Sequence, residues 1–252
     1  MAQSSLAIQL YTLRDHLKTP ADITATLQRV RKIGYHAIEL AGLGKIDPHE
    51  LSAIIEGEGL TVCGSHVPIE SLKANPQNVI EDHQLWRCPQ IAVPGFWPKH
   101  PGDFHGFTLE FNDFVASLTA AGIRLGYHNH SHELVKHHRR TILATLIEQT
   151  DPRAWFEIDT YWIAHGGGDP IQWIGKVAGR IPCVHLKDMA IDEKRVQHMA
   201  EVGEGNLNFY GILDACRKAG VQWHVVEQDI CQRDPFESIA ISLNNLHEIG
   251  LE

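Results

Sequence analysis

Four residues of the chain have the chemistry of ligands for a single metal ion. Each follows a β-rich run, and apolar residues directly precede the last three of them: Glu133, Asp159, His185 and Glu227. A carboxylate that ends an apolar strand is costly to bury unless it is paired or bound to metal, and three converging carboxylates repel one another without a cation. One imidazole and three carboxylates suit Mn²⁺ or Mg²⁺, while Co²⁺, Fe²⁺ or Zn²⁺ are compatible. We therefore predict one divalent metal ion, with Mn²⁺ favoured, against the alternative that each acid only caps a helix or pairs with an arginine.

A histidine cluster precedes the first of these ligands. If Tyr127-His128-Asn129-His130 lies on a strand, His128 and His130 point to the same side. Imidazole titrates near neutral pH, so either histidine is a candidate proton carrier, and the alternative role is to orient a metal ligand. We predict that proton transfer is carried out by one of four residues: Glu133, Glu227, His130 or His128.

Other polar and aromatic residues stand at or just after the ends of the β-rich runs. Trp162, with Phe96 and Trp97, is placed to form an apolar wall for a sugar ring or simply to roof the fold. Only Lys187 and scattered arginines such as Arg14 offer partners for a phosphate, so an unphosphorylated substrate is at least as well supported. The candidate substrate-binding residues are Gln9, Glu39, His66, Trp162 and Lys187.

The elements that must position these residues recur with a regular rhythm. Over 252 residues, β-rich runs alternate with amphipathic helical runs at intervals of about 30 residues. Eight strands with intervening helices predict an α/β protein with a (β/α)₈ TIM barrel, as a single domain over residues 1–252, which carries its chemistry at the carboxyl ends of its strands. The predicted strands are Leu6–Tyr11, Ala37–Leu40, Thr61–His66, Gln90–Pro94, Arg124–His130, Trp155–Asp159, Cys183–Lys187 and Trp223–Gln228.

Residues typical of helix ends support this division. Asp169-Pro170 and Asp234-Pro235 each fit an N-cap followed by proline in the first helical position. Apolar residues recur with the helical period over 23–33 and 236–249, which predicts helices there. Glycines between a helical run and a strand fit left-handed helix C-termini, and they are Gly34, Gly59, Gly122 and Gly220.

The composition limits the kinds of binding partner and the cellular compartment that we expect for this protein. The formal net charge of −9 is opposite to that of most proteins that bind nucleic acid through its phosphates. No run of about 20 apolar residues predicts a membrane helix. The first ten residues lack a signal-peptide pattern, and five scattered cysteines without CxxC spacing fit reduced thiols. We expect a cytoplasmic protein whose partner is a small molecule rather than nucleic acid or a membrane; the sequence leaves a homo-oligomer open.

Five sequence motifs resemble those of the sugar phosphate isomerase/epimerase group, within the xylose-isomerase-like barrel superfamily. That superfamily also includes inosose dehydratases, ketose 3-epimerases and endonuclease IV. The resemblance covers nearly the whole chain, and it implies a TIM barrel with a metal-dependent activity. The motifs are Gln9-Leu10-Tyr11-Thr12-Leu13-Arg14-Asp15, Tyr127-His128-Asn129-His130 with Glu133, Val184-His185-Leu186-Lys187-Asp188, Val202-Gly203-Glu204-Gly205 and Val226-Glu227-Gln228-Asp229.

The resemblance also implies a ligand set. The family's Glu, Asp, His and Glu on strands five to eight correspond here to Glu133, Asp159, His185 and Glu227. Ketose epimerases hold the first ligand within the strand, where Gly126 stands in this chain and cannot bind metal. His128 or His130 is therefore the alternative to Glu133.

These inferences together predict a metal-dependent isomerase or epimerase. The metal would bind two adjacent oxygens of a sugar or polyol, and a proton would move next to the carbonyl through an enediolate. The alternative is a lyase or dehydratase that acts on a keto-sugar, a 3-keto-glycoside or a keto-inositol. Two minor alternatives are an endonuclease IV-like DNA repair nuclease, which needs three zinc ions, and a non-catalytic sugar-binding barrel.

Overall fold

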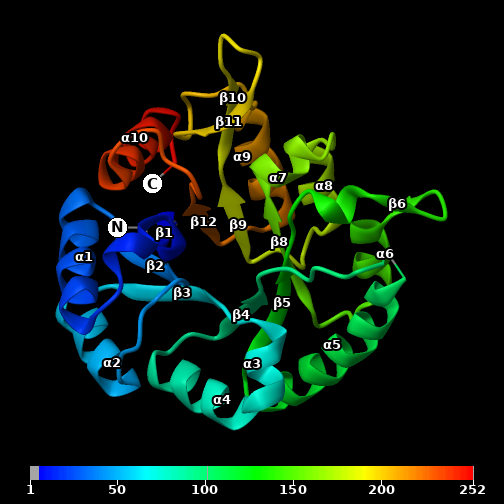
Figure 1. The fold of residues 1–252 in the computed structure, drawn as a ribbon, viewed down its shortest axis with the longest axis horizontal. Helices are drawn as coiled ribbons and strands as arrows, with labels where there is room; N and C mark the ends of the chain where they lie inside the picture. Colours follow the sequence, from blue (N-terminus) through cyan, green and yellow to red (C-terminus); the bar gives the residue numbers. More distant parts are fainter. Residues whose placement is uncertain (1–5, 101, 252) are drawn as a thin grey trace.

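Eight parallel strands form a closed barrel in the computed structural model, which describes residues 6–100 and 102–251 (Figure 1). The order around the ring is β1-β12-β9-β8-β5-β4-β3-β2. This confirms the predicted TIM barrel. The barrel strands are β1 (Leu6–Gln9), β2 (Ala37–Leu40), β3 (Thr61–His66), β4 (Gln90–Val93), β5 (Arg124–His128), β8 (Trp155–Asp159), β9 (Cys183–Leu186) and β12 (Trp223–Val226).

Helices surround the barrel and cover the outer face of its strands (Figure 1). Strand residues such as Phe156, Ile158 and Val184 pack outward into the large core shared with these helices. The helices are α1 (Pro20–Ile33), α2 (Pro48–Gly57), α3 (Ile69–Ala74), α4 (Pro76–Leu85), α5 (Asp103–Ala120), α6 (Ile142–Gln149), α7 (Thr160–His165), α8 (Pro170–Lys176), α9 (Phe209–Ala219) and α10 (Pro235–Glu248), with short 3₁₀ turns η1 (Leu10–His16) and η2 (His132–Leu134).

The predicted strands agree with the structure apart from their carboxyl ends. Three have the predicted bounds, whereas five end one or two residues earlier, because the chain leaves the barrel to form the loops of its mouth. In particular, β5 ends at His128, so His130 lies beyond the strand. The predicted helix over 23–33 begins earlier, at Pro20, because Thr19 and Asp22 form a capping box.

The two predicted N-caps are present, and the predicted glycines all have positive φ, although Gly34, with φ of 127°, lies outside the left-handed helical region. Asp169 and Asp234 accept hydrogen bonds from the first turns of α8 and α10, each ahead of a proline. Gly220 ends α9 in the left-handed conformation, with φ of 82°. These local interactions set where each helix starts and stops, and thereby where the following strand enters the barrel.

Two antiparallel hairpins were not predicted. The first joins β6 (Lys136–His137) to β7 (Arg140–Thr141), and the second joins β10 (Asp188–Ile191) to β11 (Gln197–Ala200). The Asp188 carboxylate anchors the second hairpin, because it accepts hydrogen bonds from the backbone N–H groups of Met189, Gly203, Gly205 and Leu207. Asp188 thus ties the loop over 202–205 to the end of β9, which places two of the sequence motifs in contact.

The inside of the barrel is apolar at its base and polar above. Trp155, Cys183 and Val225 belong to the small apolar cluster that fills the base. Trp155 fits because Gly126 faces it: a Cβ on Gly126 would lie 2.3 Å from the indole Cδ2 atom. Since inward residues alternate along a strand, Glu157 and Asp159 follow Trp155 on the same inner face, toward the mouth.

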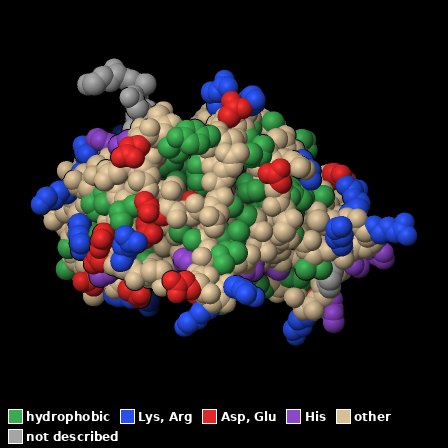
Figure 2. Space-filling model, turned by 90° about the horizontal axis from the view of Figure 1, so that it is seen from above, with side chains coloured by type: hydrophobic (Ala, Val, Ile, Leu, Met, Phe, Trp, Pro, Cys, Tyr) green, Lys and Arg blue, Asp and Glu red, His purple; other side chains and the backbone are tan. Residues whose placement is uncertain are grey.

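The surface carries charged side chains of both signs. Side chains of both charge signs are interspersed, with apolar side chains between them, on the face shown in Figure 2. No helix within residues 6–100 and 102–251 combines the length and the apolar character needed to cross a membrane.

Candidate metal centre

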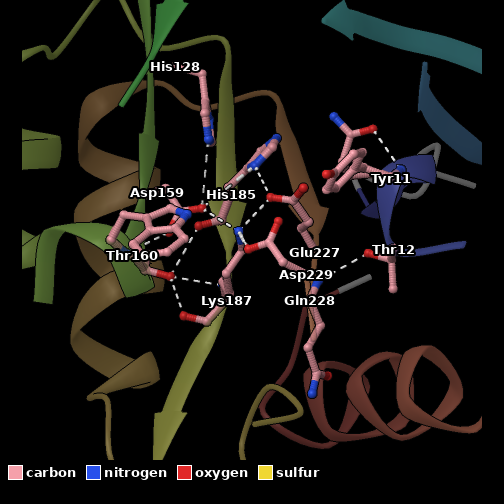
Figure 3. A network of polar contacts seen from close by, with 12 residues as sticks. Tyr11, Thr12, His128, Asp159, Thr160, His185, Lys187, Glu227, Gln228 and Asp229 are labelled. Carbon is pink, nitrogen blue, oxygen red and sulfur yellow. Dashed lines mark hydrogen bonds and ion pairs between the residues drawn. The ribbon is translucent and has the colours of Figure 1, made fainter. Parts of the chain in front are cut away.

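Four buried side chains converge at the carboxyl ends of neighbouring strands (Figure 3). His128 ends β5, Asp159 ends β8, His185 lies in β9 and Glu227 directly follows β12. The ring order places these four strands side by side. One ligand atom from each residue lies within 4.8 Å of the other three. The structure therefore brings Asp159, His185 and Glu227 together with His128, which was one of the two alternatives to Glu133.

Asp159 combines a structural contact with a free ligand atom. Its Oδ1 accepts a hydrogen bond from the backbone N–H of Trp162 at 2.8 Å and so caps α7. Its Oδ2 is buried without a hydrogen-bond partner in the described part of the chain, although Lys187 Nζ lies 3.0 Å away. Burial raises the pKa of this carboxyl to about 6, against the opposing effects of Lys187 and then His185. A buried carboxylate oxygen in this state is a fitting ligand for a cation.

His185 is held between two glutamates. Its Nε2 lies 2.7 Å from Glu39 Oε2, and its Nδ1 lies 3.0 Å from Glu227 Oε2. A carboxylate behind an imidazole is the usual arrangement of a metal-bound histidine, since it fixes the ring and its tautomer. Glu39 thus supports His185 from below and leaves Nδ1 directed toward Asp159 and Glu227.

His128 has a similar environment. Its Nε2 lies 4.0 Å from Asp159 Oδ2, while its Nδ1 lies 3.3 Å from Glu157 Oε2, outside hydrogen-bond geometry. Burial, and then the neighbouring His185, hold the pKa of His128 well below its usual value, so the ring is neutral and can act as a ligand. The sequence analysis did not predict Glu157 as a residue of the site. Its position two residues before Asp159 places it on the same face of the strand, and this spacing could have indicated its role.

A second group of potential ligands lies deeper in the barrel and shares both imidazoles with the first: His66, His128, Glu157 and His185. In this group His66 Nε2 is hydrogen-bonded to Glu157 Oε2 at 2.7 Å, and His185 Nε2 is occupied by Glu39. Burial and then the Glu39 charge raise the pKa of Glu157 to about 7. Because His66 Nε2 and His185 Nε2 are already hydrogen-bonded to glutamates, this group is better suited to orient the first group than to hold an ion.

Lys187 places a fixed positive charge against the candidate ligands (Figure 3). Its side chain is fully buried, and Nζ lies 3.0 Å from Asp159 Oδ2, 2.7 Å from Glu227 Oε2 and 2.7 Å from Asp229 Oδ2. Burial alone would lower the pKa of Lys187, but Asp159, Glu227 and Asp229 raise it well above its usual value. At Glu227, burial alone would raise the pKa of the carboxyl. The positive charges of Lys187 and His185 outweigh burial and hold this pKa well below its usual value.

Glu133 was expected to supply the metal ligand from the fifth strand, but both of its carboxylate oxygens make other contacts. Its Oε1 accepts a hydrogen bond from the Tyr127 hydroxyl at 2.6 Å, and its Oε2 accepts one from the His130 backbone at 2.9 Å. It belongs to neither ligand group found among the described residues. Both oxygens are used to fix the turn after β5, so Glu133 positions His130, and His128 rather than Glu133 stands in the group that could hold an ion.

A cavity of about 530 Å³ opens above the candidate ligands. His66, His128, His130, Glu227 and Asp229 form its polar part. His130 is outside the ligand groups of the described residues, and its Nδ1 is buried with no hydrogen-bond partner among them. Burial, and then Lys187, lower the pKa of His130 to about 3, so its ring is uncharged near neutral pH.

The residues expected to touch substrate are only partly in contact with this cavity. His66 lines it. Gln9 and Glu39 are fully buried below it and joined by a 2.8 Å hydrogen bond, Lys187 is enclosed by carboxylates, and Trp162 packs against His130 without lining the cavity. Barrel closure thus buries Gln9, Glu39 and Lys187 behind the mouth, and the half-buried Trp162 lies beside the cavity, so of the five residues only His66 is placed to touch a substrate directly.

Comparisons with known proteins agree on the fold. No family model matches the chain. A crystal structure of a sugar phosphate isomerase/epimerase from Parabacteroides distasonis superposes with a TM-score of 0.82 over 100% of this chain and 96% of that chain, at 23% identity. The resemblance stated from the motifs is thus confirmed at the level of the fold.

Two curated relatives match part of the chain. The rhizopine catabolism protein MocC of Rhizobium meliloti is 26% identical over 161 residues, which cover 57% of this chain and 49% of the relative. The inosose dehydratase of Geobacillus thermodenitrificans is 29% identical over 134 residues, which cover 46% of this chain and 44% of the relative. The chain thus matches about half the length of each relative.

Proposed function

We propose that this protein is a metal-dependent enzyme that moves a proton next to the carbonyl of a sugar or sugar-like polyol, with isomerisation or epimerisation as the outcome. The observation that carries the proposal is the convergence of two imidazoles and two carboxylates beneath the cavity, which His128 and Glu227 line, with the buried Asp159 Oδ2 held by the charge of Lys187 at 3.0 Å. Similarity to a sugar phosphate isomerase/epimerase supports the same class.

The donor set fits a divalent transition metal. His128, Asp159, His185 and Glu227 would hold the ion, and two imidazoles with two carboxylates favour Mn²⁺, Fe²⁺, Co²⁺ or Zn²⁺ over Mg²⁺. When bound, such an ion polarises a carbonyl and stabilises the negative charge that develops on its oxygen. The two ligand groups share His128 and His185, which favours a single ion over the three zinc ions of an endonuclease IV-like nuclease.

The residues around the ligands have distinct roles in this proposal. His130 accepts the proton from the substrate carbon and returns it, since its ring lines the cavity, is not among the ligands and has a buried Nδ1 without a hydrogen-bond partner among the described residues. Glu133 holds the His130 backbone in place. His66 and Asp229 line the cavity from β3 and from the loop after β12, where they could hydrogen-bond substrate hydroxyl groups.

A dehydratase is the second candidate function. The same proton removal followed by loss of a β-hydroxyl group would give elimination, and the partial match to an inosose dehydratase favours it. Isomerase and dehydratase share the first step, so one assay separates both from a non-catalytic barrel.

That assay measures solvent exchange. Metal-stripped protein is incubated in D₂O with a panel of ketoses, keto-glycosides and inososes, with and without Mn²⁺, and followed by NMR. We expect deuterium next to the carbonyl of at least one compound only when metal is present, and the final product distinguishes isomer, epimer and elimination. Binding without exchange across the panel, or metal-dependent nicking of abasic-site DNA, would contradict the proposal.

The support of His185 by Glu39 predicts a remote effect on metal affinity. A Cβ added to Gly64 would lie 2.6 Å from Glu39 Oε1, so Gly64→Ala should displace the carboxylate that orients His185. Loss of such support typically weakens metal binding by about 10–100-fold. Calorimetric titration with Mn²⁺ measures the change. Gly57→Ala on α2 is the control, since its Cβ would meet no atom within 4 Å; equal affinities in the two variants would refute the role of Glu39.

A further inference from the structure

The outer part of the cavity differs in character from its floor. Tyr11, Trp97 and Ile230 line it together with Pro68 and Pro94. Trp97 is 64% exposed, Ile230 63% and Tyr11 39%. Exposed apolar groups that gather at the rim of a pocket mark a binding surface more often than scattered ones do. The cavity therefore has a polar inner end and an apolar outer end.

Trp97 is held in place despite its exposure. Its indole packs on the His130 ring, with centroids 5.2 Å apart, and is stacked on the His132 ring at 5.6 Å. The approach of the chain requires Gly95, which has φ of 128° and whose Cβ would lie 2.8 Å from the indole Cη2. A rigid aromatic surface binds a flat apolar group at low entropic cost.

A second apolar surface lies at β1 and β12, which are three and four strands from β4 around the ring. The Tyr11 ring lies under the Arg14 guanidinium, 4.4 Å from its carbon, and Ile230 lies in the loop between β12 and α10. Tyr11 and Ile230 therefore face the cavity from a different side of the mouth than Trp97 does. A substrate group between them would contact apolar surface on both sides.

The charges of the cavity disfavour a phosphate in this position. Among the described lining residues, Arg14 is the one lysine or arginine. Its Nη1 and Nη2 donate hydrogen bonds to the backbone oxygens of Tyr11 and Asp229, at 3.0 and 2.8 Å. The nearby carboxylates of Glu227 and Asp229 would repel an anion. A neutral group fits this surface better than a charged one.

We propose that the rim formed by Tyr11, Trp97 and Ile230 is a subsite for an apolar, preferably aromatic, aglycone, so that the substrate is a keto-glycoside rather than a free sugar or a sugar phosphate. This inference rests on the proposed function for the sugar end of the substrate. The aglycone lies against the rim while the sugar ring reaches the polar floor.

Unreactive ligands test the subsite separately from catalysis. Phenyl and methyl glucosides (both anomers) and glucose 6-phosphate are titrated into the Mn²⁺-loaded protein by calorimetry. We expect the better phenyl glucoside to bind at least about tenfold more tightly than its methyl counterpart, and glucose 6-phosphate to bind no better than the methyl glucoside. Equal affinity for phenyl and methyl glucosides, or preference for the phosphate, would overturn the subsite.

Trp97→Ala is the matching variant. It should weaken phenyl glucoside binding about tenfold and leave methyl glucoside binding within about twofold. Tyr210→Ala is the control, because Tyr210 is 73% exposed on α9 and does not line the cavity. An equal loss for both ligands in Trp97→Ala would contradict the proposal. If phenyl glucoside binding depends on Trp97 but no substrate exchanges with solvent, the proposed function is refuted and the subsite stands. If free ketoses exchange with solvent but phenyl glucosides are not preferred, the subsite is refuted and the proposed function stands.

Discussion

His130→Asn is expected to slow metal-dependent solvent exchange by about 10²–10⁴-fold, the usual contribution of a general acid–base residue. Asparagine preserves the backbone N–H that Glu133 accepts at 2.9 Å, but its side chain has no basic ring nitrogen that could accept a proton. Mn²⁺ affinity should stay near that of the wild type, because His130 is in neither ligand group of the described residues. NMR exchange at saturating Mn²⁺ and calorimetric Mn²⁺ titration give the two values.

Two further variants make this result specific. His105→Asn, at an exposed position on α5, should exchange at the wild-type rate. Glu227→Gln should instead weaken Mn²⁺ binding, and excess Mn²⁺ should restore much of the exchange, because Glu227 is a ligand in our proposal. Wild-type exchange in His130→Asn, together with a loss in Glu227→Gln that metal does not restore, would transfer the acid–base role to Glu227.

Lys187→Met is expected to destabilise the metal-free protein by about 3–5 kcal/mol, the usual cost of leaving a buried charge uncompensated. The ammonium lies within 3.0 Å of carboxylate oxygens from Asp159, Glu227 and Asp229, and it is fully buried. Methionine fills a similar volume without the charge. Urea unfolding in EDTA measures the loss of free energy of unfolding.

Added Mn²⁺ should recover part of this stability, since an ion bound to the folded state stabilises it by mass action and supplies positive charge beside the same carboxylates. Lys218→Met is the matched control: Lys218 is 69% exposed and pairs with Asp214, so its urea midpoint should hardly change. An equally small effect at Lys187 would mean that the three acids do not depend on its charge.

The barrel and much of its centre could be predicted because local patterns determine them. Helix caps such as Asp169-Pro170, the alternation of strands and helices, and polar residues that end apolar runs are properties of short segments. Parallel strands in a barrel carry such residues to one mouth whatever the details of packing. Asp159, His185 and Glu227 were therefore found together, as expected.

Only the tertiary structure decided which residue joins them from β5. Glu133 follows the histidine cluster closely enough to suggest a ligand, but the Tyr127 hydroxyl binds its carboxylate, and Trp155 from the next strand fills the space beside Gly126. His128 is left facing Asp159. These outcomes depend on the volumes of side chains from different strands, so no local sequence pattern predicts them.

The supporting charges are a tertiary property for the same reason. Glu39 and His185 are 146 positions apart in the chain, yet their side-chain atoms lie 2.7 Å apart. Lys187 looked like a substrate contact at a strand end, but ring closure surrounds it with acids from β8 and from the loop after β12. The sequence by itself determined which chemical groups reach the mouth of the barrel; closure of the ring determined which of them face the cavity and which are buried as partners of the candidate ligands, because burial and pairing depend on neighbours that are distant in the chain.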